Sequence, residues 1–226
     1  MGIVHSGPPQ ELVSRLVNAY RITLFVETGT YFGETAYWAS QCFKEVWTIE
    51  ADEQIYQKAK KKYGDIKMIK FLLGDSKKVL KEIVEHLNHQ TLFWLDSHWS
   101  GDETYGVDDE CPLIEEIKAI VSSERSHFIF IDDSRLFLSP PPEPHKMEQW
   151  PTITQVIQTL ISGRNEYYIV IIEDVIVAVP EEARLIVANY CREANTRAWK
   201  ERSRAENLSR GPLHRRWRDR FRFLFN

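Results

Sequence analysis

Hydrophobic positions along the chain alternate between two kinds of pattern. Short apolar runs rich in β-branched and aromatic residues predict strands. Between them, segments of about ten residues repeat their apolar positions every three or four residues, as amphipathic helices do. Strands separated by such helices predict crossover units and a parallel sheet. The strands are expected at 23–26, 45–49, 67–73, 91–95 and 127–131, and the helices at 10–20, 34–43, 53–62, 76–87, 112–121 and 152–161.

The last two apolar runs depart from this alternation. Runs 167–172 and 175–179 are joined only by Glu173 and Asp174. Two residues cannot make a parallel crossover, so the runs predict an antiparallel hairpin. The predicted fold class is therefore α/β, with a seven-stranded sheet of five parallel strands plus a C-terminal antiparallel hairpin.

Charge divides the chain near residue 180. Residues 1–180 carry 17 basic and 27 acidic side chains, whereas residues 181–226 carry 12 basic and 6 acidic ones. Three segments follow from this: an N-terminal helical segment (1–22), a main domain (23–180) and a basic helical C-terminal extension (181–226). From residue 210 the extension alternates arginines with aromatic residues, as some nucleic-acid contacts do. The acidic main domain makes nucleic acid an unlikely partner, and we expect this end to pack on its own domain or across a homodimer interface.

Composition excludes several classes of protein. Hydrophobic residues make up 43% and charged residues 27% of the chain, the balance of an ordinary globular protein. No apolar stretch reaches the roughly 18 residues of a membrane helix, so no membrane contact is expected. The three cysteines are far apart and odd in number, which argues against a disulfide framework. A reducing, cytoplasmic location is therefore predicted.

The turn after the first strand carries the first chemical signal. It reads Glu-Thr-Gly-Thr-Tyr-Phe-Gly over residues 27–33. In open α/β sheets ligands bind at the carboxyl ends of the strands, so this turn is the first candidate site. Gly29 permits the turn and Gly33 permits close packing of helix on strand. The middle glycine of a dinucleotide-binding turn is missing, and so is a phosphate-binding Gly-Lys-Ser/Thr loop.

Acidic residues end the first four predicted strands: Glu27, Glu50, Asp75 and Asp96. A phosphate ligand would be repelled by this rim. S-adenosylmethionine suits it, because that cofactor carries a sulfonium and an ammonium against one carboxylate. Any single acid here is more often structural, since the helix dipole favours acids near helix N-termini. Four of them beside a glycine turn favour a cofactor site.

A second acidic group is expected on strands four and five. Asp96 and His98 follow strand four, and Asp132 and Asp133 follow strand five. Neighbouring strands end side by side, so these groups should converge. Carboxylates in one pocket repel one another and raise each other's pKa. A hard cation such as Mg²⁺ or Mn²⁺ would relieve the repulsion.

The motifs ETGTYFGET, IEADE, LDSH and IDD together resemble class I S-adenosylmethionine-dependent methyltransferases. Within that class they are similar to metal-dependent O-methyltransferases of the macrocin type, which act on antibiotic sugars. The resemblance implies a Rossmann-like sheet with helices on both faces. It also implies a cofactor site formed by Glu27, Thr28, Gly29, Thr30, Gly33, Glu50, Asp75, Ser76 and Asp96, with Glu50 at the ribose and Asp75 and Ser76 near the adenine. The implied metal ligands are Asp96, Asp132 and Asp133.

The resulting functional prediction is Mg²⁺-dependent O-methylation of a small hydroxylated acceptor. His98 and Asp96 are the predicted catalytic residues, with His98 as the base, because imidazole titrates near working pH. A purely structural role for His98 stays equally open. The alternatives are a methyltransferase of RNA or protein, and a non-catalytic cofactor-binding module. The antibiotic-sugar enzymes have a long N-terminal helical segment that helps to cover the substrate, whereas here 22 residues precede the first predicted strand. The resemblance therefore does not imply the acceptor's identity.

Overall fold

The computed structural model describes residues 7–99 and 109–209. The chain divides into two units, Met1–Arg184 and Leu185–Asn226. The first contains the sheet and every predicted site residue. In the second, the structure describes the helix α8 (Arg184–Ser209), which begins at the last residue of the first unit. The arginine-aromatic end of the chain, from residue 210, lies outside the described residues.

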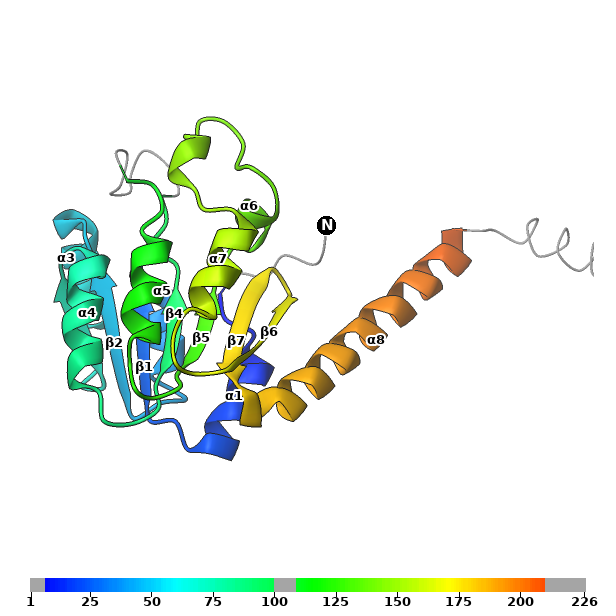
Figure 1. The fold of residues 1–226 in the computed structure, drawn as a ribbon, viewed down its shortest axis with the longest axis horizontal. Helices are drawn as coiled ribbons and strands as arrows, with labels where there is room; N and C mark the ends of the chain where they lie inside the picture. The colour runs from blue at the N-terminus through cyan, green and yellow to red at the C-terminus, as the bar shows by residue number, and fades with distance from the viewer. Residues whose placement is uncertain (1–6, 100–108, 210–226) are drawn as a thin grey trace, which may run out of the picture. The chain divides into compact units, whose positions relative to one another are not determined.

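The first unit is built on a seven-stranded sheet in the order β3-β2-β1-β4-β5-β7-β6 (Figure 1). The first five strands are parallel, and β7 runs antiparallel to both β5 and β6. The predicted arrangement of five parallel strands and a closing hairpin is confirmed. The strands are β1 (Leu24–Thr28), β2 (Glu45–Glu50), β3 (Ile69–Leu73), β4 (Leu92–Leu95), β5 (Phe128–Ile131), β6 (Tyr167–Ile172) and β7 (Val175–Pro180).

Helices cover both faces of this sheet. Successive residues of β1 point to opposite faces of the sheet. On one face the Phe25 ring contacts Trp38 and Phe43. On the opposite face Val26 packs in a hydrophobic core that includes Ile117 and Leu160. In Figure 1, α4, α5 and α7 lie in front of the sheet. The helices and 3₁₀ turns of this unit are α1 (Gln10–Tyr20), α2 (Glu34–Ala39), α3 (Glu53–Tyr63), α4 (Ser76–His86), α5 (Leu113–Val121), α6 (Arg135–Leu138), η1 (Met147–Gln149), α7 (Ile153–Leu160) and η2 (Glu181–Ala183).

Side-chain caps fix where several of these helices begin. Asp52 accepts hydrogen bonds from the backbone N–H groups of Gln54 and Ile55 at the start of α3. At α7, Thr152 and Gln155 form a reciprocal capping box. Such caps satisfy backbone donors that the first helical turn leaves unpaired. The acids and hydroxyls that precede the helices are therefore part of the fold as well as candidates for chemistry.

Two segments differ from the predicted pattern. Helix α2 ends at Ala39 instead of residue 43, where the Ser40 hydroxyl bonds back to the carbonyl of Tyr37. Serine side chains compete with helical backbone bonds in this way. In the proline-rich stretch 133–151, where the sequence pattern predicts no helix or strand, the structure contains α6 and η1.

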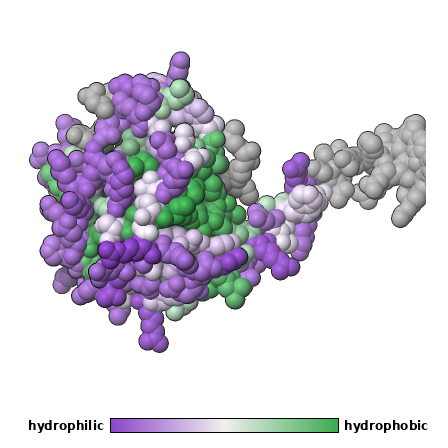
Figure 2. Space-filling view, viewed as in Figure 1, coloured by the Kyte–Doolittle hydropathy of each residue, from purple (hydrophilic) through white to green (hydrophobic). Residues whose placement is uncertain are grey.

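The surface of this face is uneven in polarity. Figure 2 shows hydrophilic side chains over the α3 and α4 side and hydrophobic ones gathered toward the β6–β7 hairpin. Tyr167 and Ile169 of β6 are only partly buried against the core, and Ile171 is exposed. Strand β6 forms one edge of the sheet. Among the described helices, none is both long and apolar enough to cross a membrane.

Candidate active site

The glycine turn after β1 lies directly against the end of β4. Gly29 has φ of 82°, a conformation that residues with a Cβ rarely adopt. A Cβ on Gly29 would lie 2.2 Å from the carbonyl oxygen of Asp96. The N–H of Gly29 donates to the carbonyl of Ile49, 3.0 Å away at the end of β2. The ends of three neighbouring strands therefore meet at this turn.

Glu50, at the end of β2, supports the same turn. Its Oε2 accepts the backbone N–H of Tyr31 at 3.0 Å, and its Oε1 accepts that of Asp52 at 3.0 Å. Burial raises the pKa of Glu50, although these N–H groups act in the opposite direction. Each carboxylate oxygen keeps acceptor capacity beyond these bonds. Tyr31 has φ of 48° and an exposed ring next to that of Phe32.

Glu27 lies beneath the turn and is fully buried. Thr48 Oγ1 donates to Glu27 Oε2 at 2.6 Å, and Thr48 Oγ1 lies 2.6 Å from Thr30 Oγ1. Burial raises the pKa of Glu27 well above its usual range, and the charges of Asp96 and Glu50 add to the effect. The structure thus gives Glu27 a supporting position under Thr30. Gly33, with φ of 79°, packs against the Tyr63 ring.

The two residues predicted near the adenine have separate roles in this structure. Asp75 caps α4, since its Oδ1 accepts the backbone N–H of Lys77 at 3.0 Å. Ser76 is hydrogen-bonded to the buried carboxylate of Glu116, which also bonds the side chains of Ser97 and Thr28. The Ser97 hydroxyl donates to Glu116 Oε1 at 2.7 Å. One carboxylate on α5 thus joins β1, α4 and the segment after β4.

Sequence reasoning missed Glu116. Burial raises its pKa, and its exposed fraction is 1%. A usable signal was present, because Glu116 shares the apolar face of α5 with Leu113, Ile117 and Ile120. A carboxylate on such a face must find partners, and three hydroxyl groups supply them.

His98 is at the centre of the charged group. Its Nε2 lies 3.0 Å from Asp133 Oδ2, and its Nδ1 lies 3.7 Å from Asp96 Oδ1. Burial alone would lower the pKa of His98. The hydrogen bond to Asp133 and the charges of Asp96 and Asp132 outweigh burial and raise the pKa. The predicted convergence of these four side chains is thus present.

The three aspartates differ in their titration. Burial raises the pKa of Asp96 to about 6 and that of Asp132 to about 7, and repulsion from the neighbouring carboxylates adds to both. Burial acts on Asp133 in the same direction. Hydrogen bonds and charges from His98 and Arg135 overcome it and lower the pKa of Asp133. Asp133 is therefore the carboxylate most firmly held in its ionised form.

Arg135 and Asp174 complete this edge and were not predicted from the sequence. Arg135 Nη1 lies 2.5 Å from Asp133 Oδ1 and also pairs with Asp174 Oδ2. Asp174 is the second residue of the β6–β7 turn, and its Oδ1 accepts the backbone N–H of Arg135 at 2.9 Å. The hairpin turn thereby fixes the segment that follows β5.

The predicted metal ligands do not fit a divalent ion in this arrangement. Asp96, Asp132 and Asp133 share one edge of the sheet. Repulsion between them adds to the raised pKa of Asp96 and of Asp132, whereas His98 and Arg135 lower the pKa of Asp133. Both oxygens of Asp133, however, face nitrogen atoms of His98 and Arg135. Within 7–99 and 109–209, no three His, Cys, Asp or Glu side chains are grouped so as to hold a metal ion.

A wall of aromatic and histidine rings borders His98. The Trp150 ring centroid lies 5.4 Å from that of His98 and 5.1 Å from that of His145. The buried carboxylate of Glu110 accepts Trp150 Nε1–H at 2.7 Å and the backbone N–H of Lys146. Glu110 therefore ties the segment before α5 to the segment after α6, and it closes one side of the site.

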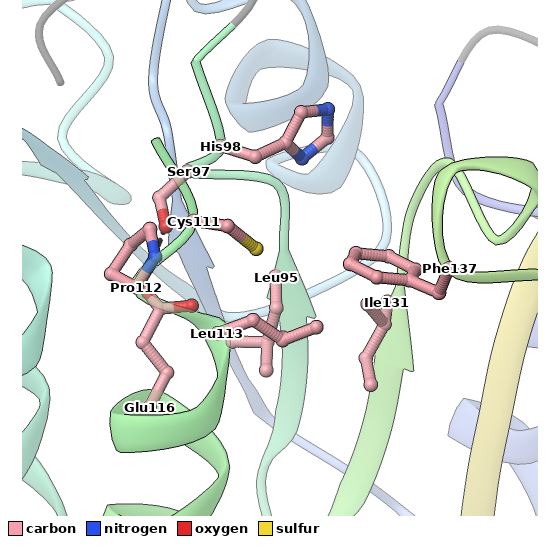
Figure 3. Close-up of a pocket in the computed structure, with 9 residues that line it drawn as sticks. All are labelled: Leu95, Ser97, His98, Cys111, Pro112, Leu113, Glu116, Ile131 and Phe137. Carbon is pink, nitrogen blue, oxygen red and sulfur yellow. Dashed lines mark hydrogen bonds between the residues drawn. The ribbon is translucent and has the colours of Figure 1, made fainter. Parts of the chain in front are cut away.

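Figure 3 shows a small cavity beside this centre, between β4, β5 and the first turn of α5. Leu95, Leu113, Ile131 and Phe137 give it apolar walls, and Ser97, His98 and Glu116 add polar groups. It has room for about one water molecule. It is too small for a methyl acceptor, so it belongs to the interior behind His98.

The strand order, with its antiparallel β7 between β5 and β6, matches the Rossmann-like fold of methyltransferases. Comparison with solved structures agrees. The chain is similar to an O-methyltransferase from Bacillus cereus in complex with S-adenosylhomocysteine, with a TM-score of 0.54 and 14% sequence identity, over 77% of this chain and 82% of that one.

It is also similar to an S-adenosylhomocysteine-bound methyltransferase from Podospora anserina, with a TM-score of 0.52 and 15% identity, over 76% of each chain. No family model matches the sequence, and no curated protein matches it. At these identities the likeness establishes the fold. The chemistry must be argued from the residues of this chain.

Proposed function

We propose that the protein is an S-adenosylmethionine-dependent methyltransferase that transfers the methyl group to a hydroxyl oxygen. One observation carries the proposal: the Gly29 turn is packed on Asp96, and His98 follows two residues later. In this fold a ligand lies outside the carboxyl ends of the strands. A cofactor on the turn would therefore have its methyl group close to a buried histidine.

The cofactor site is proposed at the turn and its two flanks. Thr28, Gly29, Thr30 and Gly33 would surround the methionine end. Glu50 suits the ribose, because its carboxylate is fixed by two backbone N–H groups and retains lone pairs for two hydroxyls. Ser76, held by Glu116, and Asp75 flank the expected position of the adenine. The two solved structures named above contain S-adenosylhomocysteine, the product form of this cofactor.

His98 is proposed as the base that takes the proton of the acceptor hydroxyl. Asp133 can only accept a hydrogen bond, so Nε2 of His98 must carry the hydrogen between them. In neutral His98 the lone pair is then on Nδ1, the atom that faces Asp96. As the acceptor oxygen attacks, its O–H proton passes to Nδ1. Bound S-adenosylmethionine would supply the methyl group: the C–O bond would form as the C–S bond breaks, and the sulfonium would become a neutral thioether.

The acceptor is proposed to be a small hydroxylated molecule. The observation behind this choice is the basic, carboxylate-flanked imidazole, which suits deprotonation of an alcohol or phenol. A methyltransferase of RNA or protein shares the fold and remains the alternative. The metal dependence expected from the sequence rests on the three neighbouring carboxylates of Asp96, Asp132 and Asp133. The pairing of Asp133 with Arg135 opposes it, and no step is assigned to a metal.

Calorimetric titration with S-adenosylhomocysteine tests the cofactor site. The protein should bind one equivalent, and Gly29→Ala should weaken binding at least about tenfold, because the new Cβ would displace the end of β4. Gly7→Ala is a matched control: Gly7 also has positive φ, but its Cβ would meet only Thr35 Oγ1 at 3.8 Å. NAD binding as tight as that of S-adenosylhomocysteine would refute the proposal. A screen of hydroxylated acceptors would then identify the substrate.

A further inference from the structure

The carboxylate of Asp133 is occupied on both of its oxygens. Oδ2 lies 3.0 Å from His98 Nε2, and Oδ1 lies 2.5 Å from Arg135 Nη1. Its side chain is 23% exposed, so solvent screens these contacts only in part. Charge-assisted bonds of this kind are among the stronger hydrogen bonds in proteins.

Arg135 is fixed from its far side as well. Asp174 pairs with its guanidinium through Oδ2, and the Oδ1 of Asp174 accepts the backbone N–H of Arg135 at 2.9 Å and the Ser134 hydroxyl at 3.1 Å. The backbone N–H of Ser134 donates to the carbonyl of Asp174 at 2.8 Å. The Asp174 side chain is 7% exposed. Arg135 is therefore held in place from two elements, the hairpin turn and its own segment.

The charges at this edge need a cation, and Arg135 supplies one. Asp96, Asp132 and Asp133 are three carboxylates in mutual electrostatic contact. A permanently charged guanidinium beside one of them reduces the repulsion that would otherwise favour a metal ion. A metal on the same carboxylate would lie within about 5 Å of the guanidinium, where the two positive charges repel.

We propose that Arg135 takes the place of a divalent metal ion in this site, so that the native protein binds Mg²⁺ and Mn²⁺ weakly and transfers methyl groups without them. The catalytic part of this inference rests on the proposed function, whereas the metal-binding part does not. Asp96, Asp132 and Asp133 then form a latent metal site that the Arg135–Asp174 pair keeps closed. Removal of the guanidinium should open it.

Titration with Mn²⁺, followed by the electron paramagnetic resonance signal of the free ion, tests this directly. Arg135→Gln should bind one Mn²⁺ at least about tenfold more tightly than the native protein. Asp133→Asn in the Arg135→Gln background should remove the gained site. Arg184→Gln is the matched control, because Arg184 also pairs with a carboxylate, that of Glu181, and its loss changes the net charge equally. It should leave Mn²⁺ binding as in the native protein.

The inference would be overturned if the native protein bound Mn²⁺ as tightly as Arg135→Gln does. It would also be overturned if Arg135→Gln showed no Mn²⁺ binding. Circular dichroism of each variant reports whether it is folded. If Arg135→Gln does not fold, Asp174→Asn, which loosens Arg135 from the other side, should show the same gain in a smaller degree. A chelator should not affect methyl transfer by the native protein. Loss of methyl transfer in the presence of the chelator would refute the inference. Failure of the native protein to bind S-adenosylhomocysteine would instead refute the proposed function and leave the Mn²⁺ comparison standing.

Discussion

Two buried histidines lie at opposite ends of the same sheet, and their pKa values are shifted in opposite directions. His98 follows the carboxyl end of β4, and His127 precedes the amino end of β5. The pKa of His98 is raised, whereas burial, with the positive charges of His89 and Arg125, lowers that of His127 to about 4. Burial acts in the same direction on both rings. The carboxylates beside His98 reverse its effect there.

The surroundings of His127 are those of a structural residue. Its Nδ1 accepts the backbone N–H of Thr91 at 3.3 Å, so its Nε2 carries the hydrogen that is shared with Ser123 Oγ at 3.0 Å. Its ring meets Phe93 edge-on at 5.3 Å. Both nitrogens are satisfied in the neutral form. At the other end of the sheet, Nδ1 of His98 faces a carboxylate oxygen, Asp96 Oδ1, at 3.7 Å. His127 therefore holds strands together, whereas His98 is the histidine that we propose to move a proton.

The largest effect is expected from replacement of His98. His98→Gln should lower kcat about 100- to 10,000-fold, because the base is lost while the glycine turn is unchanged. Affinity for S-adenosylhomocysteine should stay within about threefold of native. His86→Gln, on the exposed end of α4, is the control and should leave kcat as it is. Unchanged kcat in His98→Gln would assign His98 the same structural role as His127.

The next effect concerns stability. The folded pKa of His127 lies below its unfolded value of about 6.5, so the unfolded state binds more protons between these values. Its contribution to stability is therefore complete above about pH 6.5 and is lost as pH falls toward 4, by about 3 kcal/mol. Urea unfolding of the native protein and His127→Gln at pH 7 and at pH 4 measures it. From pH 7 to pH 4, the difference in unfolding free energy between the two proteins should fall by about 3 kcal/mol. A difference that stays constant would contradict a neutral His127 in the folded protein.

The smallest effect is a shift in pH dependence. The carboxylate of Asp133 raises the pKa of His98, so Asp133→Asn should lower the pKa of His98. Because neutral His98 is the proposed base, kcat/KM should rise with pH through this pKa. The rise should therefore begin at lower pH in Asp133→Asn. A shift toward higher pH would mean that another group controls the profile.

The fold was largely predictable from the sequence because its signals are local. Strand and helix periods are visible within about ten residues, and the two-residue link at Glu173 and Asp174 excludes a parallel crossover. The meeting of Gly29, Asp96, His98 and Asp133 followed from topology alone, since parallel strands end at a common edge. Helix α6 was missed because it is a single turn within a proline-rich segment.

The remaining site residues depend on contacts that no local pattern encodes. Arg135 and Asp174 are 39 residues apart, and their pairing requires the β6–β7 turn to reach the segment after β5. The metal prediction counted carboxylates at strand ends but did not include the guanidinium that pairs with one of them. Glu116 was detectable as a carboxylate on an apolar face, yet its three hydroxyl partners come from separate elements.

Both residues of the β6–β7 turn have a left-handed backbone conformation, which is strained for residues other than glycine. Glu173 and Asp174 have φ of 52° and 66°, values that Asn-Gly adopts with far less strain in two-residue hairpins. An engineer who seeks a more heat-resistant protein would choose that substitution first. It would leave Arg135 without the carboxylate that holds it beside Asp133. A thermostabilised hairpin should therefore bind Mn²⁺ more tightly than the native protein does, because Arg135 would be held less firmly beside Asp133.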